Sequence, residues 1–153
     1  MMNNITVVPM TLSHIDAVYN IECNSFSDPW PKKEIIFELA QEHSICLVAL
    51  LDSEVAGYVT MRHVVNEGHI CNIAVDETHR KKGIATALVQ GLVDAATALE
   101  MIGITLEVRI GNRAAMALYH KFGFKVEGYR RGYYSYPKED AAIMWKYLYS
   151  NPS

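Results

Sequence analysis

Hydrophobic residues along the chain follow two spacings, which predict two kinds of secondary structure. Short apolar runs bounded by turn residues are typical of strands, and they lie at residues 5–8, 44–51, 55–65, 69–75, 104–109, 124–136 and 141–148. Apolar residues at helical spacing predict helices at residues 11–26, 32–42, 82–99 and 113–122. The order is therefore a strand, two helices, three strands, a helix, a strand, a helix and two strands.

Capping residues support these helix boundaries. Thr11 and Ser13 are alternative N-caps of the first helix, and Pro31 suits the first position of the second. Asn112 is the expected N-cap of the last helix, and Gly123 stops that helix from the C′ position.

The element order predicts a mixed sheet with helices packed on its faces, in the α/β (α+β) class. Residues 69–75, 82–99 and 104–109 form one βαβ unit, so their two strands should be parallel and the connection right-handed. No internal repeat or low-complexity linker interrupts the pattern. We therefore expect residues 1–153 to form a single domain.

Composition narrows the functional classes. The 153 residues are half hydrophobic, and the net charge of -3 disfavours a general attraction to nucleic acid. No apolar run is long enough to span a bilayer, and the start lacks the pattern of a signal peptide. Cys23, Cys46 and Cys71 lack CxxC spacing and are interpreted as buried thiols in a reducing compartment. We expect a cytoplasmic protein without a metal site.

A basic glycine loop precedes the third helix. Arg80, Lys81 and Lys82 run into Gly83, and the helix beyond would present unpaired N–H groups and the positive end of its dipole. Such a helix start can bind a phosphate, and glycine would allow its close approach. A Walker loop and a GxGxxG fingerprint are both absent from the sequence. The loop alone leaves two interpretations open, an anion site and an ordinary charged helix entrance.

Further motifs extend the pattern to nearly the whole chain. "RKKGIA" resembles the signature R/Q-x-x-G-x-G/A of the GCN5-related N-acetyltransferases. "NIAVDETHRKKGIATAL", "LEVRIGNRAAMALYHKFGF" and "YYSYPKEDAAIM" follow in the order typical of protein N-terminal acetyltransferases, both RimI-like and Ard-type. The resemblance implies a GNAT fold. Its central sheet is mixed and mostly antiparallel, with about seven strands, four helices and one splayed parallel pair.

The resemblance also implies acetyl-CoA as the acetyl donor, bound between the splayed strands. The pantetheine arm would pair with the backbone of Ile73, Ala74 and Val75. The pyrophosphate would lie on the N–H groups of the loop and helix start, which are Arg80, Lys81, Lys82, Gly83, Ile84 and Ala85, with Thr86 beside them. Asn112 would reach the cofactor while also capping its helix.

Three residues are candidates for the chemistry. By resemblance, Glu107 in "LEVR" is the general base, although an alternating pattern alone would make it a solvent-facing carboxylate. His69 is the competing base. Tyr119 resembles the tyrosine that protonates the leaving thiolate, with a role as a core aromatic residue as the alternative. A backbone N–H near Val75, at an expected bulge, would stabilise the oxyanion. No cysteine matches a nucleophile motif, so we expect direct attack in a ternary complex.

The substrate would be held between the loop "FSDPWP" and the late hairpin. Phe26, Pro29 and Trp30 would shape the pocket for the first side chain. Tyr133 and Tyr134 resemble the paired tyrosines that contact a substrate N-terminus, with cross-strand packing as the alternative. A pinched cleft of this kind favours a flexible chain end over an internal lysine.

Three other functions are consistent with parts of the sequence. A small cationic amine could be the acceptor if Asp28, Glu139 and Asp140 formed an acidic cluster. A non-catalytic acyl-CoA-binding module would need the glycine loop but not the catalytic residues. A nucleic-acid binder would rest on Arg130, Arg131 and the basic loop alone. The sequence predicts a monomer, and leaves open the preferred first residue and the need for a partner subunit.

Overall fold

The computed structural model describes residues 4–148, which contain a seven-stranded sheet in the order β1-β2-β3-β4-β5-β7-β6. The strands are β1 (Ile5–Pro9), β2 (Ser44–Leu51), β3 (Glu54–Val64), β4 (Glu67–Val75), β5 (Gly103–Arg109), β6 (Lys125–Ser135) and β7 (Lys138–Tyr147). The α-helices are α1 (Ile15–Ser25), α2 (Lys32–Leu39), α3 (Ile84–Ala98) and α4 (Arg113–Lys121). Only β4 and β5 pair in parallel within this sheet, which confirms the predicted mixed topology.

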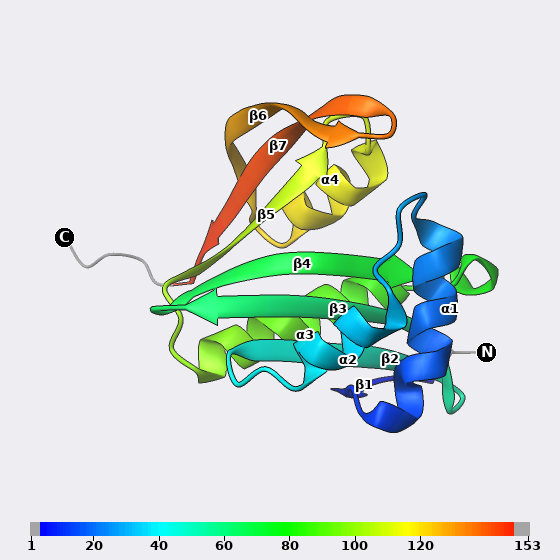
Figure 1. Ribbon diagram of the computed structural model, residues 1–153. Helices are drawn as coiled ribbons and strands as arrows, with labels where there is room; N and C mark the ends of the chain where they lie inside the picture. Colours follow the sequence, from blue (N-terminus) through cyan, green and yellow to red (C-terminus); the bar gives the residue numbers. More distant parts are fainter. Residues whose placement is uncertain (1–3, 149–153) are drawn as a thin grey trace.

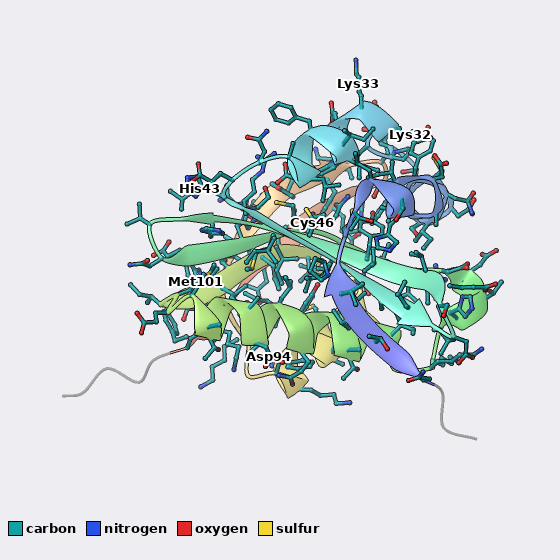
Figure 2. The ribbon with its side chains drawn as sticks, turned by 90° about the horizontal axis from the view of Figure 1, so that it is seen from below. Lys32, Lys33, His43, Cys46, Asp94 and Met101 are labelled. Atoms are coloured by element: carbon teal, nitrogen blue, oxygen red, sulfur yellow. The ribbon has the colours of Figure 1, made fainter. Side chains whose placement is uncertain are left out.

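The helices cover both faces of the sheet, so the core has two layers. Helices α1 and α2 lie on one face and α3 on the other, and Figure 2 shows Lys32 and Lys33 pointing outward from α2 and Asp94 from α3. The larger core cluster joins α3 and α4 to the sheet, with Leu88 and Leu92 fully buried. Burial of these apolar side chains away from water stabilises the packing of the helices on the sheet.

The ends of the first two helices differ slightly from expectation. Thr11 precedes a short 3-10 turn, Leu12–His14, and its N–H donates to Nδ1 of His14 at 3.0 Å. The α-helix itself begins only at Ile15. Pro31 occupies the N-cap of α2 and not its first position, because its backbone is still extended with ψ at 150°.

The predicted caps of α4 are confirmed. Asn112 Oδ1 accepts a hydrogen bond from the N–H of Ala115 at 3.1 Å, which satisfies one of the unpaired donors at the helix start. Gly123 follows the C-cap with φ at +90°, the left-handed conformation that favours glycine.

The parallel pair β4–β5 separates soon after it begins. Pairing covers Glu67 with Gly103, Gly68 with Ile104 and His69 with Thr105. Beyond these positions the two strands diverge, as Figure 1 shows. On its other side, β4 stays paired with β3 at residue 70 and at residues 72–75. One edge of β4 is therefore free along the gap.

The prediction of a bulge near Val75 is wrong. Pairing between β3 and β4 is continuous from Asn72 to Val75, and the register shifts at Cys71, which has no partner between the pairs Thr60–Asn72 and Met61–Ile70. An extra residue reverses the alternation of side chains. Ile73 consequently faces the same core cluster as Ile70.

The three thiols lie in different environments. Cys46 is buried, Cys71 is half-buried and Cys23 is exposed, so the expectation of three buried cysteines holds for Cys46 alone. Burial raises the pKa of Cys46 to about 12, with smaller contributions from the nearby Glu38 and Cys71. Within residues 4–148, no helix combines the length and the apolar character that crossing a membrane requires.

Candidate active site

A cleft of about 460 Å³ opens where β4 and β5 diverge. Its walls come from the loop between α1 and α2, from both strands, from α4 and from the β6–β7 hairpin. The predicted residues that line it are Phe26, Trp30, Ile73, Glu107, Asn112, Tyr119, Tyr133 and Tyr134. Pro29 is half-buried in the same loop without lining the cleft. Five separate segments thus supply one cavity.

The two candidate bases contact each other. His69 Nε2 lies 2.5 Å from Glu107 Oε2, where the paired part of β4 ends. The Glu107 side chain is 12% exposed and that of His69 is 44% exposed. The other carboxylate oxygen of Glu107 lies 3.5 Å from Nε of Arg130. Glu107 is therefore held between two nitrogen groups and is not the solvent-facing carboxylate of the alternative interpretation.

The surroundings of His69 favour its protonated form. The Cys71 sulfur and the Glu107 carboxylate raise the pKa of His69 to about 9, although burial works in the opposite direction. The Cys71 thiol also contacts the carbonyl oxygen of His69 at 3.6 Å. His69 therefore keeps its proton at neutral pH, and its Nε2 donates to Oε2 of Glu107.

Tyr119 is both a core residue and part of the cleft wall. Its ring is 3% exposed, packs in the larger core cluster and lies 5.4 Å from the ring of Phe124. The residue also lines the cleft beside Asn112 and Ala115. Burial raises the pKa of Tyr119 above its ordinary value, with a smaller effect from Tyr134, so the hydroxyl remains a proton donor at neutral pH.

The paired tyrosines both reach the cleft because β6 is irregular. Arg130 pairs with Ala141 and Tyr134 with Glu139, so residues 131–133 bulge out of the ladder. In a regular strand, neighbouring side chains would point to opposite faces. Here the rings of Tyr133 and Tyr134 meet edge to face, with centroids 5.0 Å apart.

Tyr134 is held further by Arg109, whose guanidinium lies 4.2 Å from the ring centroid. Burial is the largest cause that raises the pKa of Tyr134 to about 12, followed by the neighbouring Tyr133. The hydroxyl therefore stays protonated and can donate a hydrogen bond to a peptide carbonyl.

A second hollow, of about 220 Å³, lies at the start of α3. It is lined by the predicted phosphate residues Arg80, Lys81, Gly83, Ile84, Ala85 and Thr86, together with His79 and with Val75, which was predicted to contact the pantetheine arm. Lys82 is exposed beside it, and Ala74 is buried in the sheet. The hollow contains basic side chains and the first N–H groups of a helix, which is the donor set that a pyrophosphate needs.

The backbone of this loop explains its glycine. Gly83 is the N-cap of α3 with φ at +85°, and Lys81 has φ at +63°. A Cβ on Gly83 would meet nothing closer than Ile5 Cδ1 at 3.9 Å. Within the protein, glycine is therefore needed for its left-handed backbone and not for lack of space.

The site contains residues that the sequence reasoning missed. Glu22 lines the cleft although it is buried in α1, and Arg130 contacts Glu107. For Glu22 the signal was available, because it lies four residues after Val18 on the apolar face of its helix. For Arg130 the sequence offered no local signal, because its contact with Glu107 joins β6 to β5, which are separated along the chain.

Known proteins share both the sequence pattern and this geometry. Residues 15–124 match the model of the acetyltransferase (GNAT) family. A Bacillus subtilis protein, provisionally designated a [ribosomal protein bS18]-alanine N-acetyltransferase, is 36% identical over 137 residues, which cover 89% of this chain and 91% of that protein. A Sulfurisphaera tokodaii N-alpha-acetyltransferase is 32% identical over 146 residues, covering 87% of each.

A solved structure agrees with the fold. The crystal structure of the ribosomal-protein-S18-alanine N-acetyltransferase from Escherichia coli superposes with a TM-score of 0.89 at 28% identity, covering 98% of this chain and 97% of that one. The family match covers well over half of the chain and includes the glycine loop and the splayed strands. The chain therefore belongs to the acetyltransferase (GNAT) family, and it is an acetyltransferase that uses acetyl-CoA as its acetyl donor.

Proposed function

We propose that this enzyme acetylates the N-terminal α-amino group of proteins, with a small first residue such as the alanine of a ribosomal protein. The observation that carries the proposal is a contact between two walls of the cleft that Glu107 lines. Ser27 Oγ, in the α1–α2 loop, donates a hydrogen bond to the carbonyl oxygen of Tyr136 in the hairpin at 3.3 Å. A protein N-terminus brings backbone on one side only of its first residue into such a cleft. An internal lysine would bring backbone on both sides, and the contact between the two walls leaves less room for it.

The names of the relatives support the same substrate class. The Bacillus and Escherichia proteins bear names for alanine acetylation on ribosomal protein bS18, and the Sulfurisphaera protein is named for α-amine acetylation in general. The pocket walls Phe26 and Trp30 are large aromatic residues, which leave room for a small first side chain. We therefore favour alanine over bulky first residues.

Two regions of the protein offer hydrogen-bonding groups that suit acetyl-CoA. The free edge of β4 at Ile73–Val75 offers backbone groups to an amide-bearing arm, and the hollow at Gly83 offers N–H groups and cationic side chains to a pyrophosphate. Bound acetyl-CoA supplies an acetyl group on a sulfur leaving group. Asn112 lines the cleft at the start of α4, and we assign it a contact with the pantetheine part of the cofactor.

The chain's own residues perform the proton transfers. An α-amino group has a pKa of about 8, so it needs only a modest base near neutral pH. Glu107 takes the proton, with His69 and Arg130 fixing its carboxylate, and Tyr119 donates a proton towards the departing sulfur. The amine attacks the acetyl carbonyl directly, so no acetylated residue forms on the enzyme.

Two of the three acidic residues needed for a small-cation site are already engaged. Glu139 accepts from Arg109 Nη1 at 3.2 Å and from the N–H of Gly111 at 2.7 Å, and Asp140 accepts from the N–H of Gly132 at 2.8 Å. Asp28 lines the cleft. This arrangement favours a peptide over a polyamine as the acceptor.

The decisive test compares two peptides in an acetyl-CoA turnover assay. One begins with a free alanine, and the other has the same sequence with a blocked α-amine and free lysines. We expect turnover of the first and little of the second. Efficient modification of the blocked peptide would contradict the proposal, and acetyl-CoA binding without turnover on any amine would point to a non-catalytic module. A monomeric state and a cytoplasmic location stay predictions.

A further inference from the structure

Glu22 is a buried carboxylate for which the acetyl transfer itself has no use. It is 1% exposed, in the third turn of α1. Its Oε2 accepts from the N–H of Trp30 at 2.9 Å, and its Oε1 accepts from Asn72 Nδ2 at 2.9 Å and from the hydroxyl of Tyr58. Among residues 4–148, no cationic side chain forms an ion pair with it.

A buried charge without a counter-ion is costly unless hydrogen bonds replace its hydration. Here three donors converge on two oxygens, and a carboxylate accepts all three because it carries no hydrogen of its own. The pKa of the Tyr58 hydroxyl is raised, mainly by burial and next by its bond to Glu22, so the tyrosine remains a donor. All three donors of the cluster are therefore paired with the Glu22 oxygens.

The three donors come from three different segments of the fold. Trp30 belongs to the α1–α2 loop, Asn72 follows the Cys71 bulge on β4, and Tyr58 lies on β3. Trp30, Asn72 and Glu22 all line the cleft. One carboxylate thus ties the α1–α2 loop to β4, the strand whose other edge is free along the gap.

We propose that Glu22 is a positioning residue that sets the size of the pocket for the first substrate side chain. Its carboxylate holds the backbone N–H of Trp30 and the side-chain amide of Asn72 together. The pocket therefore remains narrow and favours small first residues. The inference rests on the proposed function, because it concerns the selectivity of that same peptide site. Glu22 contacts no reacting atom and acts through Trp30.

Glu22→Gln is the direct test. The glutamine keeps the size of the side chain, but its NH2 group would face a donor, which leaves one bond of the cluster broken. Tyr58→Phe removes one donor and leaves the carboxylate, so it tests the same cluster if Glu22→Gln folds poorly. Loosening the Trp30 anchor should widen the pocket.

Glu38→Gln is a matched control. Glu38 is also 1% exposed, lies on α2, and accepts from Arg62 and from Ser44 Oγ at 2.7 Å. It does not line the cleft. A purely structural effect of losing a buried carboxylate should therefore appear in Glu38→Gln as well.

The measurement is kcat/KM for two peptides that differ only in a first residue of alanine or leucine. We expect the wild-type preference for alanine to fall about tenfold in Glu22→Gln, an effect comparable to altering a side-chain pocket by a methylene or two. The change should arise in peptide KM, with KM for acetyl-CoA within about twofold of wild type. Tyr58→Phe should show a smaller change in the same direction, and Glu38→Gln should leave the ratio unchanged.

Two results would overturn the inference. One is an unchanged alanine-to-leucine ratio in both Glu22→Gln and Tyr58→Phe, and the other is an equal change in Glu38→Gln. Failure of the proposed function looks different, because wild type would then acetylate neither peptide. If wild type acetylates the alanine peptide and the variants keep its selectivity, the inference about Glu22 alone fails.

Discussion

His69 Nε2 and Glu107 Oε2 lie 2.5 Å apart, on adjacent parallel strands at the point where these strands separate. The sequence presents the two residues as competing bases. In the structure they form one hydrogen-bonded pair, with Arg130 on the other side of the carboxylate. Glu107 lines the cleft and His69 contacts its carboxylate, so we propose that Glu107 is the base and that His69 positions it.

Replacing Glu107 should affect chemistry more than binding. Glu107→Gln should lower kcat by about 10²- to 10⁴-fold, the usual contribution of a general base, with little change in peptide KM. His69→Gln should lower kcat less, since Glu107 remains in place. The double variant should resemble Glu107→Gln, because the two residues act as a unit.

Steady-state kinetics with an alanine-initiated peptide checks this. Glu127→Gln, at an exposed carboxylate on β6 that contacts Tyr147, serves as the control and should behave like wild type. A larger loss in His69→Gln than in Glu107→Gln would assign the base to His69 instead.

Stability should depend on pH through His69. Its pKa rises from an ordinary value of about 6.5 in the unfolded chain to about 9 in the folded protein. The stabilisation from the pair is therefore fully present below about pH 6.5 and is lost as the pH rises through about 9. Because the histidine is nearly half exposed, solvent screening keeps the effect small.

Urea unfolding of wild type and His69→Gln between pH 6 and pH 10 measures this contribution. The difference in free energy of unfolding should shrink across that window. A difference that stays constant from pH 6 to pH 10 would show that the proton is not held by the pair.

The hydroxyl of Tyr119 should matter for turnover and hardly for folding. Tyr119→Phe keeps the ring that packs against Phe124. It removes the proton donor that burial keeps protonated. We expect kcat to fall by about 10²-fold or more while the melting temperature changes little. Tyr129→Phe, at an exposed position on β6, provides the matched control. Unchanged kcat in Tyr119→Phe would leave that tyrosine with its packing role alone.

Acetyl-CoA affinity should depend more on the backbone at Gly83 than on the charge at Lys81. A side chain at Gly83 is strained by the φ of +85°, at a cost of about 1–2 kcal/mol for a left-handed L-residue. Gly83→Val should therefore weaken binding of acetyl-CoA more than Lys81→Ala, which removes one cation and keeps the loop. Calorimetric titration measures both. A stronger loss in Lys81→Ala would mean that side-chain charge dominates the site.

Local patterns in the sequence were sufficient to predict the helices and strands. The strand at Ser44–Leu51 and the α4 boundaries at Asn112 and Gly123 agree with expectation, because apolar spacing and capping depend on neighbours within a few residues. Motif resemblance indicated Glu107 and Tyr119 as site residues, and both line the cleft.

Contacts between distant segments were decided by the tertiary structure. The bulge at Cys71, the bulge that turns Tyr133 and Tyr134 to one side, and the cluster around Glu22 each depend on the partner strand or helix. A one-residue shift in register reverses which face a side chain occupies, and no local pattern records it. The sequence by itself determined which groups this enzyme possesses. Their meeting at the splayed strands, with His69 on Glu107 and Glu22 on Trp30, was decided by long-range strand pairing and packing.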